Sequence, residues 1–182
     1  MGNRPLPFSI IFFISSSKLE DNTIIVLWAD HGYHLGDKSA TVKFTLWEKA
    51  NRVPFIIVAP GITKPGTRCE RPVSLVDVFP TLNELAGLPL KPELDGQSLV
   101  PLLKNPQMEW QRPALMTQNP GNHAVRSERW RYIRYRDGTE ELYDHTKDPW
   151  EHENLASNPE YNHIKEQHKK WLPTHEKALR RK

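Results

Sequence analysis

Residues 23–32, TIIVLWADHG, place an unbroken apolar run directly before Asp30, His31 and Gly32. Apolar side chains on both sides of a strand indicate burial of both faces, as in the middle of an α/β sheet. Ligands of open α/β sheets lie just beyond the carboxyl ends of such strands. Asp30 and His31 are therefore candidate ligands of one cation, with Gly32 allowing the backbone to turn beneath them. A packed His31 beside a capping Asp30 is an equally good interpretation of the dipeptide alone.

A second apolar run, VPFIIVAPG at residues 53–61, ends in Pro-Gly. Between the two runs, residues 43–52 have helical character, and Glu48 and Arg52 are spaced to pair on one helix face. We assign that pair to structure. Strand, helix and strand within about forty residues predict a parallel βαβ unit.

The chain changes character after about residue 107. Before it, PVSLVDVFPTLNELAGLP predicts a helix that Asp77 caps and Gly87 ends, and LDGQSLVPLLK predicts a turn and a short helix. After it, residues 123–144 alternate, with turn signals at Ser127-Glu128 and Asp137-Gly138. This pattern predicts an antiparallel meander with one solvated face, followed by a polar helix introduced by Pro159. We expect an α/β layer followed by a small antiparallel-sheet-and-helix subdomain.

The composition narrows the class of protein. Of the 182 residues, 37% are hydrophobic and 26% charged, which indicates a globular protein rather than a disordered one. The net charge of +3 arises from interleaved acids and bases, so nucleic acid is not an expected partner. Residues 1–18 carry an apolar stretch that is too short to span a bilayer, and we interpret them as a leader.

Five blocks, in order along the chain, resemble the sulfatase family of the alkaline-phosphatase-like superfamily. The similarity is closest to the branch of iduronate-2-sulfatase-like and related bacterial enzymes. It runs from about residue 19 to about residue 156. The blocks are NTIIVLWADHGYHLGDKSATVKFTLWEKANRVPFIIVAPG, PVSLVDVFPTLNELAGL, LDGQSLVPLL, AVRSERWRYIRY and ELYDHTKDPWEHENLA.

The resemblance implies a fold and a site. Residues 19–107 would be the C-terminal part of an alkaline-phosphatase-like α/β/α core, and residues 108–182 the sheet-and-helix subdomain. Asp30 and His31 would be metal ligands, usually for Ca²⁺; the softer imidazole leaves room for Zn²⁺ or Mn²⁺. Lys43 would be a catalytic residue that contacts the sulfate and stabilises the leaving oxygen. His34 would line the substrate pocket, although a surface or packing role fits it equally well.

The resemblance also implies a sulfated small molecule or carbohydrate as the substrate, and it favours a periplasmic or secreted location. The family's formylglycine motif, Cys or Ser followed by x-Pro-x-Arg, is absent from the sequence. We therefore expect a C-terminal fragment that is inactive alone, because covalent catalysis needs its nucleophile. An apolar strand without its neighbours predicts self-association or dependence on an N-terminal-half partner. Two alternatives stay open: a phosphoester hydrolase of the same superfamily and a non-catalytic sulfatase-like remnant.

Overall fold

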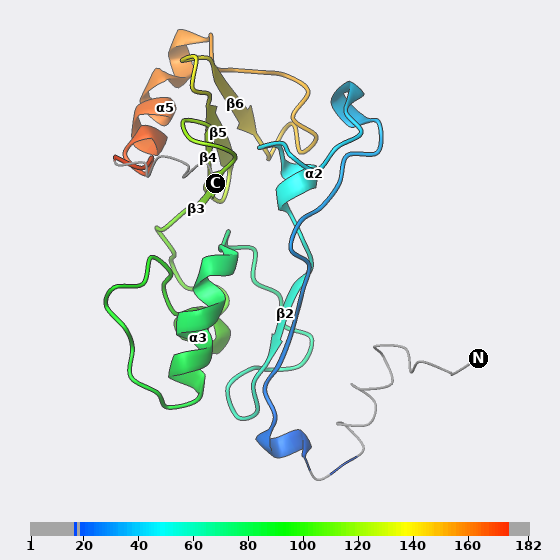
Figure 1. Cartoon of the computed structure of the whole chain (residues 1–182), viewed down its shortest axis with the longest axis vertical. Coiled ribbons are helices and arrows are strands. Elements are labelled where there is room, and N and C mark those ends of the chain that lie inside the picture. The colour runs from blue at the N-terminus through cyan, green and yellow to red at the C-terminus, as the bar shows by residue number, and fades with distance from the viewer. Residues whose placement is uncertain (1–16, 18, 175–182) are drawn as a thin grey trace, which may run out of the picture.

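A computed structural model describes residue 17 and residues 19–174. Its strands form two separate antiparallel sheets, and its α-helices are short (Figure 1). The strands are β1 (Ile25–Trp28), β2 (Phe55–Val58), β3 (Ala114–Thr117), β4 (His123–Arg126), β5 (Trp130–Arg134) and β6 (Glu140–Asp144). The α-helices are α2 (Glu48–Asn51), α3 (Val78–Leu85), α4 (Val100–Lys104) and α5 (Asn162–Lys169). In this part of the chain no helix is long and apolar enough to cross a membrane.

The first sheet corrects the predicted parallel βαβ unit. β1 and β2 pair antiparallel, with Ile25 opposite Val58 and Trp28 opposite Phe55. A parallel return needs a long crossover, usually a helix that spans the sheet. Here the connection is mostly loop, and its only α-helix, α2, has four residues. The two apolar runs had indicated burial of both strand faces. That expectation is wrong for the described residues, because neither β1 nor β2 contains a buried residue and Trp28 is 52% exposed. The runs carried no information on strand direction. The α/β/α layering expected from the resemblance is likewise not formed by the described residues.

The second sheet confirms the predicted meander. Its strands follow the order β3-β4-β5-β6, and every neighbouring pair is antiparallel. The β4–β5 and β5–β6 turns fall at the two predicted signals, whereas β3 and its turn to β4 precede the predicted residues 123–144. The expected solvated face is wrong, because residues 130–133 of β5 are all buried. Tyr132 faces a cluster that includes Leu142 of β6 and is covered by residues of and around α5. Ile133 faces the opposite cluster with Leu46, from the segment before α2.

The helix predicted from Asp77 is present as α3, but its cap differs. The short 3-10 turn Leu75–Asp77 leads into α3, and Ser74 and Asp77 form a reciprocal capping box at its start. The buried Asp77 carboxylate also accepts hydrogen bonds from Arg112, at 2.6 Å, and from the backbone N–H of Gln97, at 2.9 Å. Asp77 thereby ties the helix to two later segments. Gly87 follows the helix with φ +67°, as a C-terminal glycine should.

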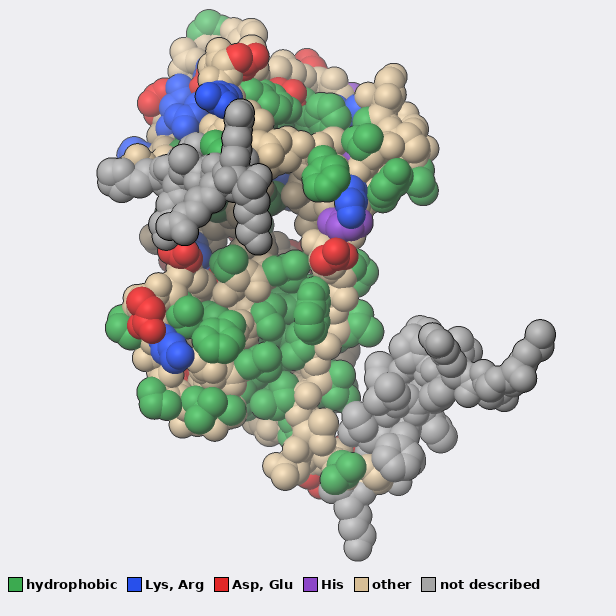
Figure 2. All heavy atoms as spheres, in the orientation of Figure 1, with side chains coloured by type: hydrophobic (Ala, Val, Ile, Leu, Met, Phe, Trp, Pro, Cys, Tyr) green, Lys and Arg blue, Asp and Glu red, His purple; other side chains and the backbone are tan. Residues whose placement is uncertain are grey.

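The two sheets lie at different ends of the molecule. β1, β2, α3 and α4 form one part, and the meander and α5 form the other, with α2 beside the meander (Figure 1). A cavity of about 1800 Å³ separates the parts, and an opening between them is visible in Figure 2. The lining of the cavity includes β2 and the segment that precedes α2. The division into domains at residue 107 stays a prediction, and the proposed leader lies almost wholly outside the described residues.

Candidate functional site

Asp30, His31 and Lys43 lie together at the cavity. Nε2 of His31 is 3.0 Å from Nζ of Lys43 and 3.6 Å from Oδ2 of Asp30, and all three residues line the cavity wall. The Asp30 side chain is 85% exposed and that of His31 is 37% exposed. The sequence placed the first two residues at the end of a strand. The fold brings Lys43, at the other end of the loop that follows His31, back beside Asp30 and His31.

The loop returns to its start because its backbone pairs with itself. His34 N–H donates to Val42 O at 2.9 Å, and Gly36 N–H donates to Ala40 O at 2.9 Å. These bonds close residues 34–42 into a narrow excursion, so Lys43 emerges beside His31. The helix α2 holds the base of the excursion, since Gly32 N–H donates to Ala50 O at 2.8 Å.

Gly32 is required here for close approach. A Cβ at this position would lie 2.0 Å from the carbonyl oxygen of Lys49 in α2, a distance that no side chain tolerates. Only glycine lets the chain after His31 lie against the α2 backbone. The sequence had suggested that Gly32 permits a sharp turn. In the structure glycine is needed at this position because of the close contact with α2.

The tautomer of His31 follows from its two partners. Nδ1 lies 2.8 Å from Gly32 O, an oxygen that can only accept, so Nδ1 carries the hydrogen. Nε2 is then the nitrogen with a free lone pair, and the Lys43 ammonium donates to it. This is the arrangement of a metal-ligating histidine, in which a backbone carbonyl fixes the tautomer and the ring orientation.

The donor set fits a divalent cation only in part. A carboxylate oxygen and an imidazole nitrogen 3.6 Å apart can both lie within about 2.3–2.6 Å of one ion, as Ca²⁺ requires. Ca²⁺ takes six to eight ligands, mostly oxygen, so water or other protein groups must supply the rest. The high exposure of Asp30 leaves room for them.

His34 lies apart from these three side chains. It is 1% exposed, its Nε2 is 3.0 Å from Thr45 Oγ1, and its ring contacts Trp47 edge-on at 5.6 Å. It does not line the large cavity. Burial lowers its pKa, with nearby Asp37 acting in the opposite direction. This position favours the packing role over substrate contact, which stays a prediction.

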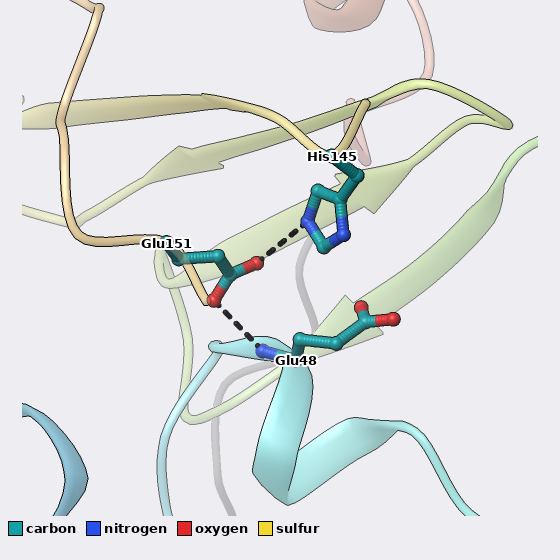
Figure 3. A group of neighbouring side chains, drawn as sticks. All are labelled: Glu48, His145 and Glu151. Carbon is teal, nitrogen blue, oxygen red and sulfur yellow. Dashed lines mark hydrogen bonds and ion pairs between the residues drawn. The ribbon is translucent and has the colours of Figure 1, made fainter. Parts of the chain in front are cut away.

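Sequence reasoning missed a buried charge cluster between α2 and the meander. Glu48, at the start of α2, converges with His145 and Glu151, which both lie in the loop that follows β6 (Figure 3). One Glu151 oxygen accepts from the Glu48 backbone N–H at 2.9 Å and so caps α2, and the other lies 2.9 Å from His145 Nε2. Arg131, 1% exposed, forms ion pairs with both glutamates, at 2.7 Å with Glu151.

These partners argue against a metal ion in the cluster. Glu48 faces Arg131 and, at 3.3 Å, Arg126, whereas its predicted partner Arg52 is 4.0 Å away. Burial alone would raise the pKa of the Glu48 carboxyl. The positive charges of Arg131 and Arg126 have the larger effect and hold that pKa below its usual value. A cation would have to displace Arg131 from both carboxylates. The cluster therefore fastens α2 to the meander, and the separation of its members along the chain left no local sequence signal.

Comparison with known proteins agrees with the resemblance. Residues 36–178 match the family profile described as N-sulphoglucosamine sulphohydrolase, C-terminal. The chain belongs to the sulfatase family. Among curated relatives, a sulfatase from Formosa agariphila is 39% identical over 88% of this chain and 31% of its own length. A Δ4,5-hexuronate-2-O-sulfatase from Bacteroides thetaiotaomicron is 32% identical over 90% of this chain and 37% of its own length.

Solved structures of the superfamily superpose on most of the chain. A sulfatase structure from Bacteroides thetaiotaomicron matches 90% of it and 38% of its own chain, with a TM-score of 0.75 and 30% identity. The phosphonate monoester hydrolase of Agrobacterium radiobacter also gives a TM-score of 0.75, at 27% identity, over 90% of this chain and 36% of its own. This chain thus spans about a third of the length of the curated relatives it matches, and the matching family region is the C-terminal one.

Proposed function

We propose that this chain is the C-terminal portion of a sulfuric ester hydrolase and supplies one side of its active site. The observation that carries the proposal is the convergence of Asp30, His31 and Lys43 at the cavity, with Nε2 of His31 within 3.6 Å of both other groups. A carboxylate, an imidazole held in the ligating tautomer and an ammonium are the groups that recognition of a cation and an anionic ester requires.

Each of the three side chains has a role in the proposed site. Asp30 and His31 would hold the divalent cation, Ca²⁺ being the family's usual ion. When bound, the cation would stabilise the negative charge that develops on the sulfuryl oxygens. Lys43 would bind a sulfate oxygen and stabilise the leaving oxygen. In the structure its ammonium donates to Nε2 of His31 at the cavity wall, so a bound cation would have to displace it before it could contact the substrate.

The chain alone should not turn over a sulfate ester. Its sequence contains no Cys or Ser followed by x-Pro-x-Arg, and covalent catalysis depends on that nucleophile. The substrate class we propose is a sulfated carbohydrate, because a relative with 32% identity is described as a hexuronate-2-O-sulfatase. Sulfatase activity measured from the pure chain would contradict this assignment of roles.

A second candidate keeps the site but changes the ester. The similarity to a phosphonate monoester hydrolase favours it, because an Asp-His pair and a lysine suit a phosphorus oxyanion as well. Metal content separates the two: one calcium favours the sulfatase, and two zinc ions favour the phosphorus ester. The third reading, a non-catalytic remnant, predicts no cation site at Asp30.

Titration calorimetry with Ca²⁺ tests the cation site directly. Two protein ligands should give weak binding, with a Kd on the order of 10⁻³ M. Asp30→Ala should abolish it. Asp21→Ala is the matched control, since Asp21 is also exposed and lines the same cavity without contacting His31. Equal binding by the wild type and Asp30→Ala, or no binding by either, would remove the basis for the proposed metal site.

A further inference from the structure

The excursion of residues 34–42 is fastened to the meander by one side chain at its tip. The ammonium of Lys38 donates to the hydroxyl of Tyr143 in β6, at 3.1 Å, and to the backbone carbonyl oxygen of Glu151 in the loop that follows β6. It also lies 4.7 Å from the ring centroid of Trp47 and 4.4 Å from that of Tyr143. Hydrogen bonds and cation–π contacts together hold this side chain in one place, unlike that of a solvated surface lysine.

The backbone on both sides of this contact has a conformation that side chains disfavour. Among the described residues four non-glycine residues have a positive φ, and three of them meet here: Lys38 at +53°, Ser39 at +56° and Glu151 at +60°. Such residues cost free energy, persist only where surrounding contacts hold them, and are frequent at functional sites. The Lys38 ammonium joins the two strained segments, so the shape of the tip depends on it.

The arm that leads from this tip to Lys43 is held along its length. Ala40 N–H donates to Asp37 O at 3.0 Å, and the carbonyl oxygens of Ala40 and Val42 accept hydrogen bonds from the opposite arm. These bonds make the two arms and the tip one unit. A displacement of the tip would therefore be passed along the backbone to Lys43.

Lys43 and His31 are held from different sides. His31 precedes the contact of Gly32 with α2, which does not involve the tip. Lys43 is held on one side by the arm and on the other by an exposed hydrogen bond, which Gln118 Nε2 donates to Phe44 O at 2.7 Å. Loss of the tip contact should therefore displace Lys43 and leave His31 in place.

A second contact at the tip is weaker. Asp37 pairs with Lys49 of α2 at 2.6 Å, but their side chains are 39% and 34% exposed, and an ion pair open to water contributes little to holding a segment. Burial lowers the pKa of Lys38, with the carboxylates of Glu141 and Glu151 acting in the opposite direction. The Lys38 ammonium is thus removed from water to a degree that the Asp37 pair is not.

We propose that Lys38 is a positioning residue of the candidate site: it fixes the tip of the excursion to the meander and so keeps Lys43 beside His31. Lys38 does not line the large cavity, so it would act only through Lys43. The catalytic meaning of Lys43 rests on the proposed function, whereas the placement of its ammonium does not. The meander would thereby help to set the geometry of the site, in addition to forming part of the cavity wall.

The test follows the His31 imidazole by nitrogen NMR in the full chain labelled with ¹⁵N at histidine, at about pH 8, above the usual histidine pKa of about 6.5. The signal is assigned by its absence from His31→Gln. The resonance of a lone-pair nitrogen changes when it loses a hydrogen-bond donor, and Lys43→Met gives its position after complete loss. The disrupting variant is Lys38→Met, which keeps an unbranched stem and removes the ammonium. Lys49→Met is the matched control, because it removes the same charge from the exposed pair at the tip.

Lys38→Met should move the Nε2 resonance of His31 by more than half of the change seen in Lys43→Met, and Lys49→Met should leave it nearly unchanged. The Nδ1 resonance should stay in place, because Gly32 O still holds that nitrogen. A general loosening of the structure would move both resonances. An unchanged Nε2 resonance in Lys38→Met, an equal change in Lys49→Met, or a joint movement of both nitrogens would overturn the proposal.

Tyr143→Phe is the second variant, since it removes one acceptor of the Lys38 ammonium and keeps the ring. It should move the Nε2 resonance in the same direction as Lys38→Met and by less. Melting by circular dichroism checks that each variant folds, and if Lys38→Met does not, an unchanged resonance in Tyr143→Phe overturns the proposal. The NMR measurement needs no metal ion. Absence of Ca²⁺ binding by the wild type would therefore count against the proposed function alone, and an unchanged His31 resonance would count against the positioning role alone.

Discussion

The Lys43 ammonium lies 3.0 Å from Nε2 of His31, on the lone pair that a metal ion would use. Because Nδ1 is committed to Gly32 O, His31 cannot offer its other nitrogen instead. Lys43 therefore stands in the place of a cation and competes with one. A bound divalent ion must turn the lysine away from His31, which would free its ammonium for the substrate anion.

This competition predicts that Lys43→Met raises the affinity for Ca²⁺. The substitution removes a competing donor and a like charge close to the ion, and charges a few ångströms apart in a watery site interact by about 1 kcal/mol. We expect Kd to fall about three- to tenfold in titration calorimetry. Lys49→Met removes the same charge from an ion pair with Asp37 at 2.6 Å and should leave Kd nearly unchanged. The same effect in both variants would mean that net charge alone is responsible.

The ion-pair cluster makes a prediction about stability. Glu151→Gln would leave the Arg131 guanidinium, which is 1% exposed, with Glu48 alone, and would weaken the cap of α2. Removing one partner of a buried ion pair costs about 3–5 kcal/mol, and the remaining glutamate should reduce this to about 2–3 kcal/mol. Urea unfolding measures the loss.

The neighbouring Glu153→Gln is the control for Glu151→Gln. Glu153 is exposed in the same loop, and its side chain belongs to no described ion pair, so its substitution should change the free energy of unfolding by less than about 0.5 kcal/mol. A loss below about 1 kcal/mol for Glu151→Gln would show that the cluster contributes little to holding α2 on the meander.

The structural features that local residue patterns encode could be predicted from the sequence. Alternation and the two turn signals located the meander, and the run before Asp30 located the end of a strand. The direction of β2 could not be predicted, because apolar runs without alternation look alike in either direction. The buried face of β5 was missed since its cover comes from Leu46, far away in the sequence. The partners of Glu48 were missed for the same reason: Arg126 and Arg131 lie on other elements.

The candidate site, too, could be predicted from the sequence only in part. The resemblance singled out Asp30, His31 and Lys43, and their spacing alone could not have shown that the loop closes on itself. His34 has the right residue type and lies in the same loop, but it is buried against Trp47 and away from the cavity. Burial is set by tertiary packing, so a sequence motif could not separate it from its neighbours.

Glu140 predicts a pH-dependent contribution to stability. Burial opposes its ionisation, but a hydrogen bond from Tyr132 at 2.5 Å and the ammonium groups of Lys165 and Lys169 lower its pKa to about 2. A carboxyl with a depressed pKa stabilises the fold above its unfolded pKa and loses that contribution as pH falls through its folded pKa. The window therefore lies between pH 4.5, the unperturbed value, and about pH 2.

Glu140→Gln should lower the free energy of unfolding by about 2 kcal/mol at neutral pH, and the difference from the wild type should shrink towards zero near pH 2. Urea unfolding across the acid range measures it. Glu166→Gln is the control, because Glu166 also pairs with Lys169 but is 66% exposed, and it should have little effect at any pH. A difference that stays constant with pH would show that the Glu140 charge is not the source.

Gly32 joins the fold to the site, and its substitution tests that link. In Gly32→Ala the new Cβ would lie 2.0 Å from Lys49 O, so the chain after His31 must move away from α2. We expect a loss of about 1–3 kcal/mol in stability and a Ca²⁺ affinity at least tenfold weaker, because His31 would leave its place beside Asp30 and Lys43. Gly66→Ala is the control for the general effect of replacing a glycine, because Gly66 has φ +74° but open space around it. This substitution should lower the free energy of unfolding by about 1 kcal/mol and leave Ca²⁺ binding unchanged. Equal loss of binding in both variants, or normal binding in Gly32→Ala, would mean that contact with α2 does not position His31.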